Sequence, residues 1–190
     1  MNRKQALIFV SASVLVGLAI AALWLGRSGE SAGGRDDSTT AGTAATMAGS
    51  VTLYFPGADG RLHGELRALD TGAEGAELVK RIVGGVLAGP DNESLFAPLP
   101  QSTTVGSVVL AQDGTLYLDL TSPDHPLPPV SGSQRELLAA YSLVNSICSN
   151  VPRIRAVALL WNSEQRTTFA GNLDTRRPLT PNRSLVASAS

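Results

Sequence analysis

The side chains of this sequence that can carry out nucleophilic, acid–base or metal chemistry are few. It has one cysteine, Cys148, and two histidines, His63 and His125. Cys148 lies on the apolar stripe of an expected helix, where a thiol lacks the accessible, electropositive surroundings that make it reactive. Neither histidine has a partner at the spacing of a helical metal-binding motif. These residues therefore predict no catalytic, cofactor-binding or metal-binding site, and no cofactor.

Asp119 and Asp124 bracket the end of an expected strand. Paired carboxylates can exchange protons with a substrate or bind a cation. Aspartate is also the residue that loop entries use to accept backbone hydrogen bonds, and we favour that structural role, with both carboxylates solvated. An enzyme that uses the pair stays as an alternative. An Asp119→Asn variant altered only in stability would remove it.

Charge and composition exclude further classes. The 190 residues carry 15 Lys+Arg against 16 Asp+Glu, a formal net charge of −1. A protein that binds nucleic acid needs a concentrated basic surface, so nucleic acid is not an expected partner. A single cysteine excludes an intrachain disulfide framework and a cysteine-based zinc site. Composition thus indicates no particular activity.

An uncharged apolar stretch at residues 6–25 predicts a membrane-spanning helix. Its twenty residues are long enough for the hydrocarbon core, which is about 30 Å thick. Arg3 and Lys4 precede the stretch and Arg27 follows it, which favours an N-terminus on the cytoplasmic side. We therefore predict that residues 1–27 anchor the chain in the cytoplasmic membrane as a single-pass segment.

A cleaved secretory signal is the alternative for the same segment, because Ala19-Ile20-Ala21 resembles a cleavage site. The apolar run continues through Leu25 without a break, which favours an uncleaved anchor. Both interpretations export the rest of the chain. The folded part is therefore expected outside the cytoplasm, or in the periplasm if the envelope has an outer membrane.

The remaining sequence divides into a linker, one domain and a short tail. Residues 28–49 are rich in Gly, Ser, Ala and Thr and predict a flexible linker. Residues 50–186 have the patterned apolar sequence of a folded domain, and residues 187–190 are expected to be a disordered tail.

Alternating apolar residues predict the strands of this domain. Val51, Leu53 and Phe55 recur with a period of two, and a turn leads to a second strand at residues 62–69. Asp113-Gly114 predicts a hairpin turn. Further strands are expected at residues 105–111, 115–121, 154–161 and 166–169. The last is an exposed edge that could take up an extended partner, or an edge that the charge of Arg166 and the nearby turn protect against such pairing.

Two helices are predicted by a period of 3.6 residues. The first begins near Gly72 and ends at Gly89-Pro90, a stop signal, and Gly84-Gly85 within it allows close packing against a sheet. The second begins at Ser133-Gln-Arg-Glu136, which has the sequence of a capping box. Its expected apolar stripe comprises Leu137, Leu138, Tyr141, Val144, Ile147 and Cys148. This order of elements predicts a compact α+β domain, a mixed sheet with two helices on one face.

Segments spread over residues 51–186 resemble the GerMN domain of sporulation and spore germination proteins. They occur in the family's order. They are Val51-Thr-Leu-Tyr-Phe-Pro56, Leu87-Ala-Gly-Pro90, Leu99-Pro100 with Thr103-Thr-Val105, Asp113-Gly-Thr-Leu-Tyr-Leu-Asp-Leu-Thr-Ser122, Glu136 to Ile147, and Ala170 to Pro178.

This resemblance implies a β-α-β-β-α-β core similar to ring-building-motif domains, which assemble protein complexes in cell envelopes. Members of the family are held by a lipid or a membrane helix, and many carry two tandem copies where this chain has room for one. The family has no established catalytic residues, so none is transferred to this sequence.

The leading functional hypothesis is a membrane-anchored, extracytoplasmic, non-enzymatic module of the bacterial envelope. It would act by protein–protein interaction, with another envelope protein or with itself. The alternative is a module that binds cell-wall glycan or a small ligand. That function requires an aromatic platform, which Tyr117 and Trp161 would supply if both were exposed on one face of the sheet.

Overall fold

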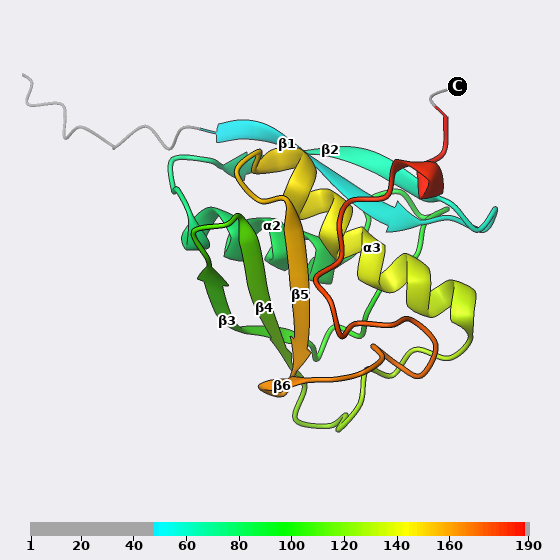
Figure 1. Cartoon of the computed structure of the whole chain (residues 1–190). Coiled ribbons are helices and arrows are strands. Elements are labelled where there is room, and N and C mark those ends of the chain that lie inside the picture. The colour runs from blue at the N-terminus through cyan, green and yellow to red at the C-terminus, as the bar shows by residue number, and fades with distance from the viewer. Residues whose placement is uncertain (1–47, 189–190) are drawn as a thin grey trace, which may run out of the picture. The chain divides into compact units, whose positions relative to one another are not determined.

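The computed structural model describes residues 48–188 (Figure 1). The predicted anchor at residues 1–27 and nearly all of the predicted linker lie outside these described residues. Between residues 48 and 188, no helix is long and apolar enough to cross a membrane. The α+β class is confirmed, with two long helices packed on β-sheet structure.

The first two strands form a sheet of their own. Strand β1 (Ala48–Pro56) pairs antiparallel with strand β2 (Leu62–Asp70). Val51, Leu53 and Phe55 point to the buried face of this hairpin, as their alternation predicts. On the opposite face Leu66 is 77% exposed.

The remaining strands form a four-stranded sheet in the order β3-β4-β5-β6. Its strands are β3 (Thr104–Leu110), β4 (Thr115–Thr121), β5 (Ala156–Trp161) and β6 (Glu164–Gln165). The sheet is mixed, because β4 runs parallel to β5 and the other pairs are antiparallel. The hairpin at Asp113-Gly114 is confirmed, with Gly114 at a φ of 86°.

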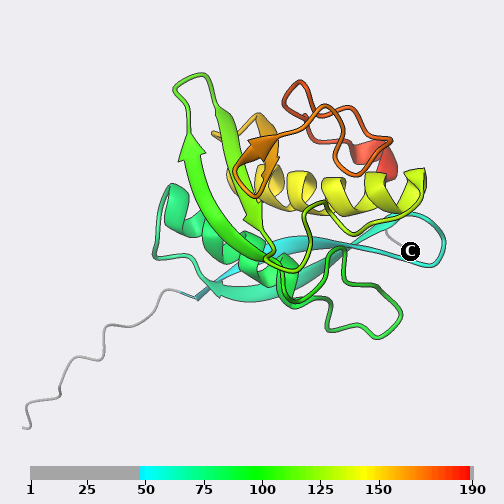
Figure 2. The same ribbon diagram turned by 90° about the horizontal axis from the view of Figure 1, so that it is seen from below.

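Helices α2 (Ala76–Ala88) and α3 (Ser133–Asn150) pack against the apolar faces of both sheets. A short 3-10 helix, η1 (Arg183–Leu185), lies near the C-terminus. Figure 2 shows α3 crossing the centre of the fold, with the C-terminal segment on one side of it. A single hydrophobic core unites side chains of α2, α3, β1, β4 and β5.

The strands form two sheets where the sequence predicts one, because side chains of α3 occupy the free edge of β1. Asn150 Oδ1 accepts a hydrogen bond from the Thr52 amide at 3.0 Å, and Asn150 Nδ2 donates to the Thr52 carbonyl at 2.7 Å. Ser146 Oγ accepts from the Tyr54 amide at 2.9 Å. These backbone groups would otherwise pair with a neighbouring strand.

The predicted edge strand at residues 166–169 is wrong. Strand β6 ends at Gln165, and the backbone after it binds the returning chain instead. Thr175 donates from its hydroxyl to the Arg166 carbonyl at 2.9 Å and from its amide to the Thr167 carbonyl at 3.0 Å. Phe169 is 3% exposed and meets Trp161 edge to face, with ring centroids 6.3 Å apart. This segment is closed to an added strand.

The two adjacent glycines of α2 have different surroundings. A Cβ at Gly85 would lie 2.8 Å from Leu53 Cδ1 on β1, whereas a Cβ at Gly84 would meet nothing within 4 Å. Gly85 therefore lets the helix approach the β1–β2 sheet closely, as the sequence predicts for this pair.

We expect Gly85→Val to destabilise the fold by about 1–3 kcal/mol, because the added carbons force α2 away from β1. Gly84→Val places the same side chain in solvent on the same helix, and it should leave stability unchanged or slightly raised, since valine has the better helix propensity. Urea unfolding followed by circular dichroism measures the free energy of unfolding of both variants. Equal effects of the two substitutions would contradict close packing at Gly85.

Candidate functional site

A groove of about 720 Å³ lies beside the N-terminal end of α3. Three loop segments and the first turns of α3 form its walls. The lining is Pro56, Gly57, Ala58, Gly60, Phe96, Ala97, Pro98, Leu99, Pro100, Pro129, Val130, Ser131, Gln134, Arg135 and Leu138. Phe96 is 54% exposed and presents an aromatic ring to this groove. Arg135 is the one ionisable residue in the lining, so the groove carries no carboxylate.

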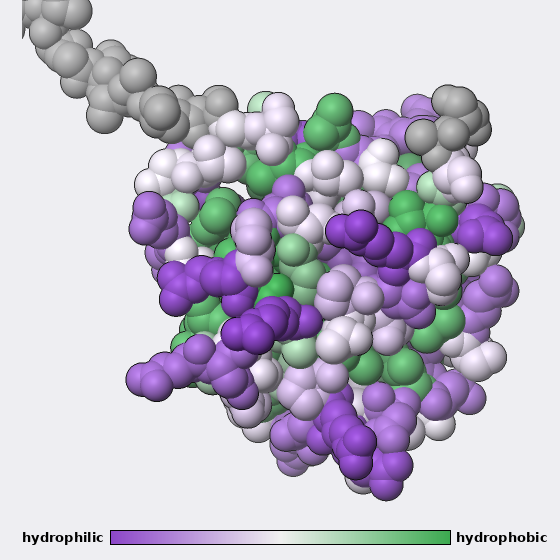
Figure 3. All heavy atoms as spheres, turned by 45° about the horizontal axis from the view of Figure 1, so that its top comes forward, coloured by the Kyte–Doolittle hydropathy of each residue, from purple (hydrophilic) through white to green (hydrophobic). Residues whose placement is uncertain are grey.

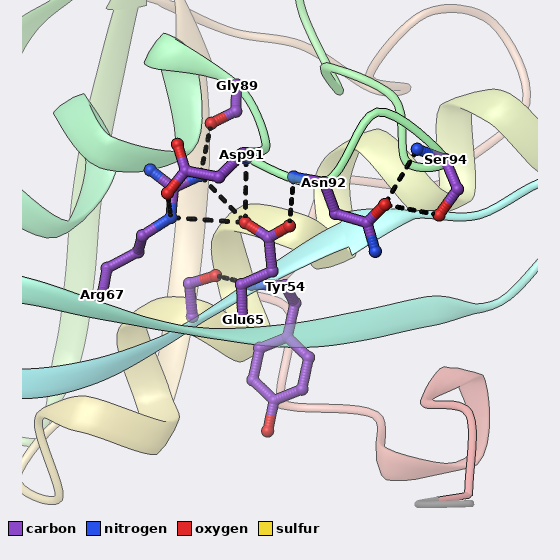
Figure 4. A network of polar contacts seen from close by, with 8 residues as sticks. Tyr54, Glu65, Arg67, Gly89, Asp91, Asn92 and Ser94 are labelled. Carbon is purple, nitrogen blue, oxygen red and sulfur yellow. Dashed lines mark hydrogen bonds and ion pairs between the residues drawn. The ribbon is translucent and has the colours of Figure 1, made fainter.

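The loop that carries Phe96 is fixed to β2 by a network of polar contacts (Figure 4). The Glu65 carboxylate accepts hydrogen bonds from the amides of Asp91 and Asn92 at 3.1 and 2.9 Å. Arg67 donates to Glu65 at 2.8 Å and to the Gly89 carbonyl at 3.0 Å. This network holds the segment that follows Gly89-Pro90 against the sheet.

The same loop is fixed again at Phe96. Asn92 Oδ1 accepts from the amide and the hydroxyl of Ser94 at 2.9 and 2.7 Å. The Phe96 amide then donates to the Pro56 carbonyl at 2.9 Å. The exposed ring of Phe96 is therefore carried by a backbone that is hydrogen-bonded at Phe96 itself and at residues 91–94 before it, and it is preorganised for contact with a partner.

Glu65 is ionised in this network. Burial alone would raise the pKa of its carboxyl, but the hydrogen bonds from Arg67, Asn92 and Asp91 outweigh burial and leave the pKa below its ordinary value. The Arg67 guanidinium also lies over the Phe55 ring at 5.6 Å from its centroid, a cation–π arrangement.

Glu136 connects α3 to the C-terminal segment. It is fully buried, at 0% exposure. Its carboxylate accepts hydrogen bonds from the amides of Ala170 (2.6 Å), Asn172 (2.8 Å) and Leu173 (2.8 Å), and from Asn172 Nδ2 (2.7 Å). Burial by itself raises the pKa of Glu136, yet these donors together hold the pKa below its ordinary value.

The capping box predicted at Ser133–Glu136 is therefore wrong. Gly132 is the N-cap, and it has no side chain to form a cap hydrogen bond. Glu136 turns away from the start of its own helix because the amides of residues 170–173 offer it more donors than one cap amide would.

Asp119 has a structural role, as favoured from the sequence, but it is buried at 5% exposure and not solvated. Its carboxylate accepts from the Ser163 amide at 2.8 Å and from the Ser163 hydroxyl at 3.0 Å. It thereby supports the turn between β5 and β6, in which Asn162 and Ser163 both have positive φ, 52° and 67°. Asp124 is exposed on the loop that follows β4.

The other candidate residues do not converge on one site. His63 is hydrogen-bonded to Asp59 at 3.0 Å on the surface, and the backbone carbonyl of His125 accepts from Trp161 Nε1 at 2.9 Å. Burial raises the pKa of Cys148 to about 11, so its thiol stays protonated near neutral pH. No group of three or more His, Cys, Asp or Glu side chains suited to a metal ion occurs among residues 48–188.

The aromatic platform considered from the sequence does not form. Tyr117 is 41% exposed, but Trp161 is only 1% exposed and packs within the core. Figure 3 shows hydrophilic and hydrophobic side chains interspersed over the face in view. Sequence reasoning missed the groove, because its walls come from three distant segments. The Gly89-Pro90 stop signal was the local sign that a loop begins there.

Comparison with known families matches residues 52–167, more than half of the chain, to the family described as "Sporulation and spore germination". The fold defines an α+β domain of the GerMN class. The chain belongs to this sporulation and spore germination family, as the resemblance in its sequence predicted. No curated protein matches the chain.

Two solved structures from Bacillus subtilis share the fold. The tandem GerMN domains of the sporulation protein GerM are 14% identical, with a TM-score of 0.55, over 84% of this chain and 51% of that one. The first GerMN domain of the same protein is 17% identical, with a TM-score of 0.55, over 72% of this chain and 98% of that one. This chain therefore spans about half of the tandem structure.

Replacing Glu65 tests whether it fixes the groove loop. We expect Glu65→Ala to lower the free energy of unfolding by about 1–3 kcal/mol, because the amides of Asp91 and Asn92 lose their acceptor. Hydrogen exchange should accelerate at those two amides first. Glu164→Ala, which removes an exposed carboxylate 3.4 Å from Arg166, should leave both measurements unchanged. Unaltered exchange at Asp91 and Asn92 in Glu65→Ala would contradict this role.

Glu136→Gln should destabilise the domain by about 2–3 kcal/mol. The carboxylate accepts hydrogen bonds from several N–H groups, and the NH₂ group of glutamine would face those donors without being able to accept from them. The folded-state pKa of Glu136 lies below the ordinary 4.5, so its contribution is present above that pH and is lost as the pH falls through the lowered value. The variant should therefore show a shallower loss of stability below about pH 4.5 than the original protein.

Chemical denaturation at several pH values between 3 and 7 measures this difference. Glu77→Gln serves as the control, because Glu77 forms an exposed ion pair with Lys80, and exposed pairs contribute little. Parallel pH curves for Glu136→Gln and the original protein would overturn the assignment.

Proposed function

We propose that this protein is a non-enzymatic interaction module of the bacterial cell envelope. An N-terminal helix anchors it in the cytoplasmic membrane, and the domain lies on the extracytoplasmic side. Its partner is another envelope protein, bound through the groove, or a second copy of the chain. Membership of the sporulation and spore germination family supports a role in that process.

One observation carries the interaction function. The groove presents an exposed aromatic ring on a loop that is fixed by hydrogen bonds, with proline-rich walls and no carboxylate. Exposed aromatic side chains in preorganised pockets are typical anchors of protein interfaces. The carboxylates of Glu65, Asp119 and Glu136, by contrast, are engaged in structural hydrogen bonds.

The sequence of residues 1–27 supports the anchor, and its flanking charges support an outward-facing domain. A linker of the composition of residues 28–49 lets the domain search a radius of roughly 25 Å from the membrane surface. The glycan-binding alternative lacks support from the feature it required, because Trp161 is buried.

A photocrosslinker at Phe96 tests the interaction function in the full chain. Phe96→p-benzoylphenylalanine in the native host should yield, on irradiation, one discrete adduct with another protein. Leu66→p-benzoylphenylalanine is the matched control, because Leu66 is even more exposed, at 77%, and lies outside the groove lining. Mass spectrometry identifies what is attached.

A discrete protein adduct at position 96 that is missing at position 66 supports the proposal. No adduct at position 96, or the same ladder of products at both positions, contradicts binding of a partner protein through the groove. An adduct that lysozyme digestion releases would instead identify wall glycan as the bound molecule.

A further inference from the structure

The outer strands of the two sheets differ in what protects their edges. Ser146 and Asn150 bind the free edge of β1. On the outer side of β2 the Ala187 amide donates to the Leu62 carbonyl at one end of the strand, and the charged residues Glu65 and Arg67 lie along the rest of it. Beyond β5, the sheet continues into β6 and into Leu179, which exchanges two 2.8 Å backbone hydrogen bonds with Val157. Within residues 48–188, no strand pairs with the outer side of β3. Figure 1 and Figure 2 both show β3 at the outer side of its sheet.

The register of the β3–β4 hairpin identifies which backbone N–H and C=O groups of β3 point away from β4. The Ala111 amide donates to the Thr115 carbonyl at 2.9 Å, and the Ala111 carbonyl accepts from the Gly114 amide at 3.2 Å, so both backbone groups of Ala111 point toward the returning strand. Hydrogen-bonded and non-hydrogen-bonded pairs alternate along an antiparallel ladder. Val109 therefore directs its backbone groups to Tyr117 on β4. Val108 and Leu110, on either side of it, direct theirs outward.

The side chains along this edge do not block pairing. Sheet proteins protect open edges with lysine, proline or charges along the edge strand. Residues 104–110, Thr-Val-Gly-Ser-Val-Val-Leu, contain none of these. Val109 is 58% exposed and its cross-strand neighbour Tyr117 is 41% exposed, so an apolar pair lies on the outer face beside the open edge. A bulge between Val105 and Val108 limits regular pairing to the C-terminal part of the strand.

We propose that β3 is a self-association edge, at which two copies of this chain pair antiparallel about a two-fold axis through Val109. In this register Val108 of each copy lies opposite Leu110 of the other, and all four outward-facing residues exchange their N–H and C=O groups. The two Val109 side chains meet on the outer face. The pairing joins the two four-stranded sheets into one continuous sheet.

A second copy is the occupant that fits this edge. The outward-facing residues are placed symmetrically about Val109, so the edge is complementary to itself, as an isologous two-fold interface requires. The strand is uncharged and the chain has a net charge of −1, so pairing places no like charges opposite each other. Anchoring in one membrane would also hold copies at high local concentration. This inference names a partner for the proposed interaction module and rests on that function, but it uses a surface separate from the groove.

Disulfide crosslinking of the full chain in its membrane tests the register. Residues opposite each other in a non-hydrogen-bonded antiparallel pair have Cα atoms about 4.5 Å apart, which is within the range of about 4.4–6.8 Å that a disulfide spans. Val109→Cys should therefore form a disulfide-linked dimer rapidly under copper–phenanthroline oxidation. Non-reducing electrophoresis detects a species of twice the chain's mass.

Two matched variants and the original protein serve as controls. Ser107→Cys lies on the same exposed strand, but the proposed register separates the two copies of residue 107 by more than about 10 Å, so it should crosslink poorly. Leu66→Cys is highly exposed on the other sheet and should also crosslink poorly. The original protein is the blank, because its one cysteine, Cys148, is half-buried and burial raises the pKa of its thiol to about 11.

A dimer at least ten times more abundant for Val109→Cys than for both other variants supports the proposal. Equal crosslinking of all three, or none at Val109, overturns it. Because Phe96 lies in the groove, the photocrosslinking result is independent. A Phe96 adduct without a Val109 dimer would support the interaction function and contradict self-association through β3. A Val109 dimer without a Phe96 adduct would contradict binding at the groove and support pairing through β3.

Discussion

The buried carboxylate of Glu136 is the interaction on which the C-terminal third of the fold depends. An ionised group can remain buried only if hydrogen bonds replace the water that it loses, and the amides of residues 170–173 supply them. The segment held in this way then continues to Leu179 and Asn182. Leu179 extends the sheet beside β5, and Asn182 exchanges two hydrogen bonds with Asn145 of α3.

Helix α3 is thus a structural centre that uses polar side chains as well as apolar ones. Ser146 and Asn150 complete the edge of β1, Asn145 and Glu136 hold the C-terminal segment, and Leu143 and Ile147 pack in the core. Polar groups of this kind specify where each neighbour lies, because a misplaced one would remain buried without a partner. The start of the same helix also forms a wall of the groove, so the groove is built on the most constrained element of the domain.

Local patterns in the sequence predicted most of the elements, but not the end of the last strand, which was expected at residues 166–169. The alternation of Val51, Leu53 and Phe55 and the stop at Gly89-Pro90 reflect local geometry that the structure confirms, while the first helix begins at Ala76, later than the expected start near Gly72. The errors arose where a side chain bonds to a distant segment. Ser133–Glu136 has the spacing of a capping box, but Glu136 binds amides 34 to 37 positions later. Likewise, nothing near Asn150 in the sequence shows that it binds Thr52, which separated one expected sheet into two.

The hydrogen bonds between Asn150 and Thr52 join residues 98 positions apart, and this separation determines the order in which the domain can form. The β1–β2 hairpin is made early during synthesis, yet its open edge is unprotected until the end of α3 has emerged. Such long-range closure slows folding and leaves a strand exposed to wrong partners in the meantime. A nascent chain halted before residue 150 would therefore be a substrate for chaperones. A chain synthesised beyond residue 173 would contain the amides that donate hydrogen bonds to the Glu136 carboxylate in this fold.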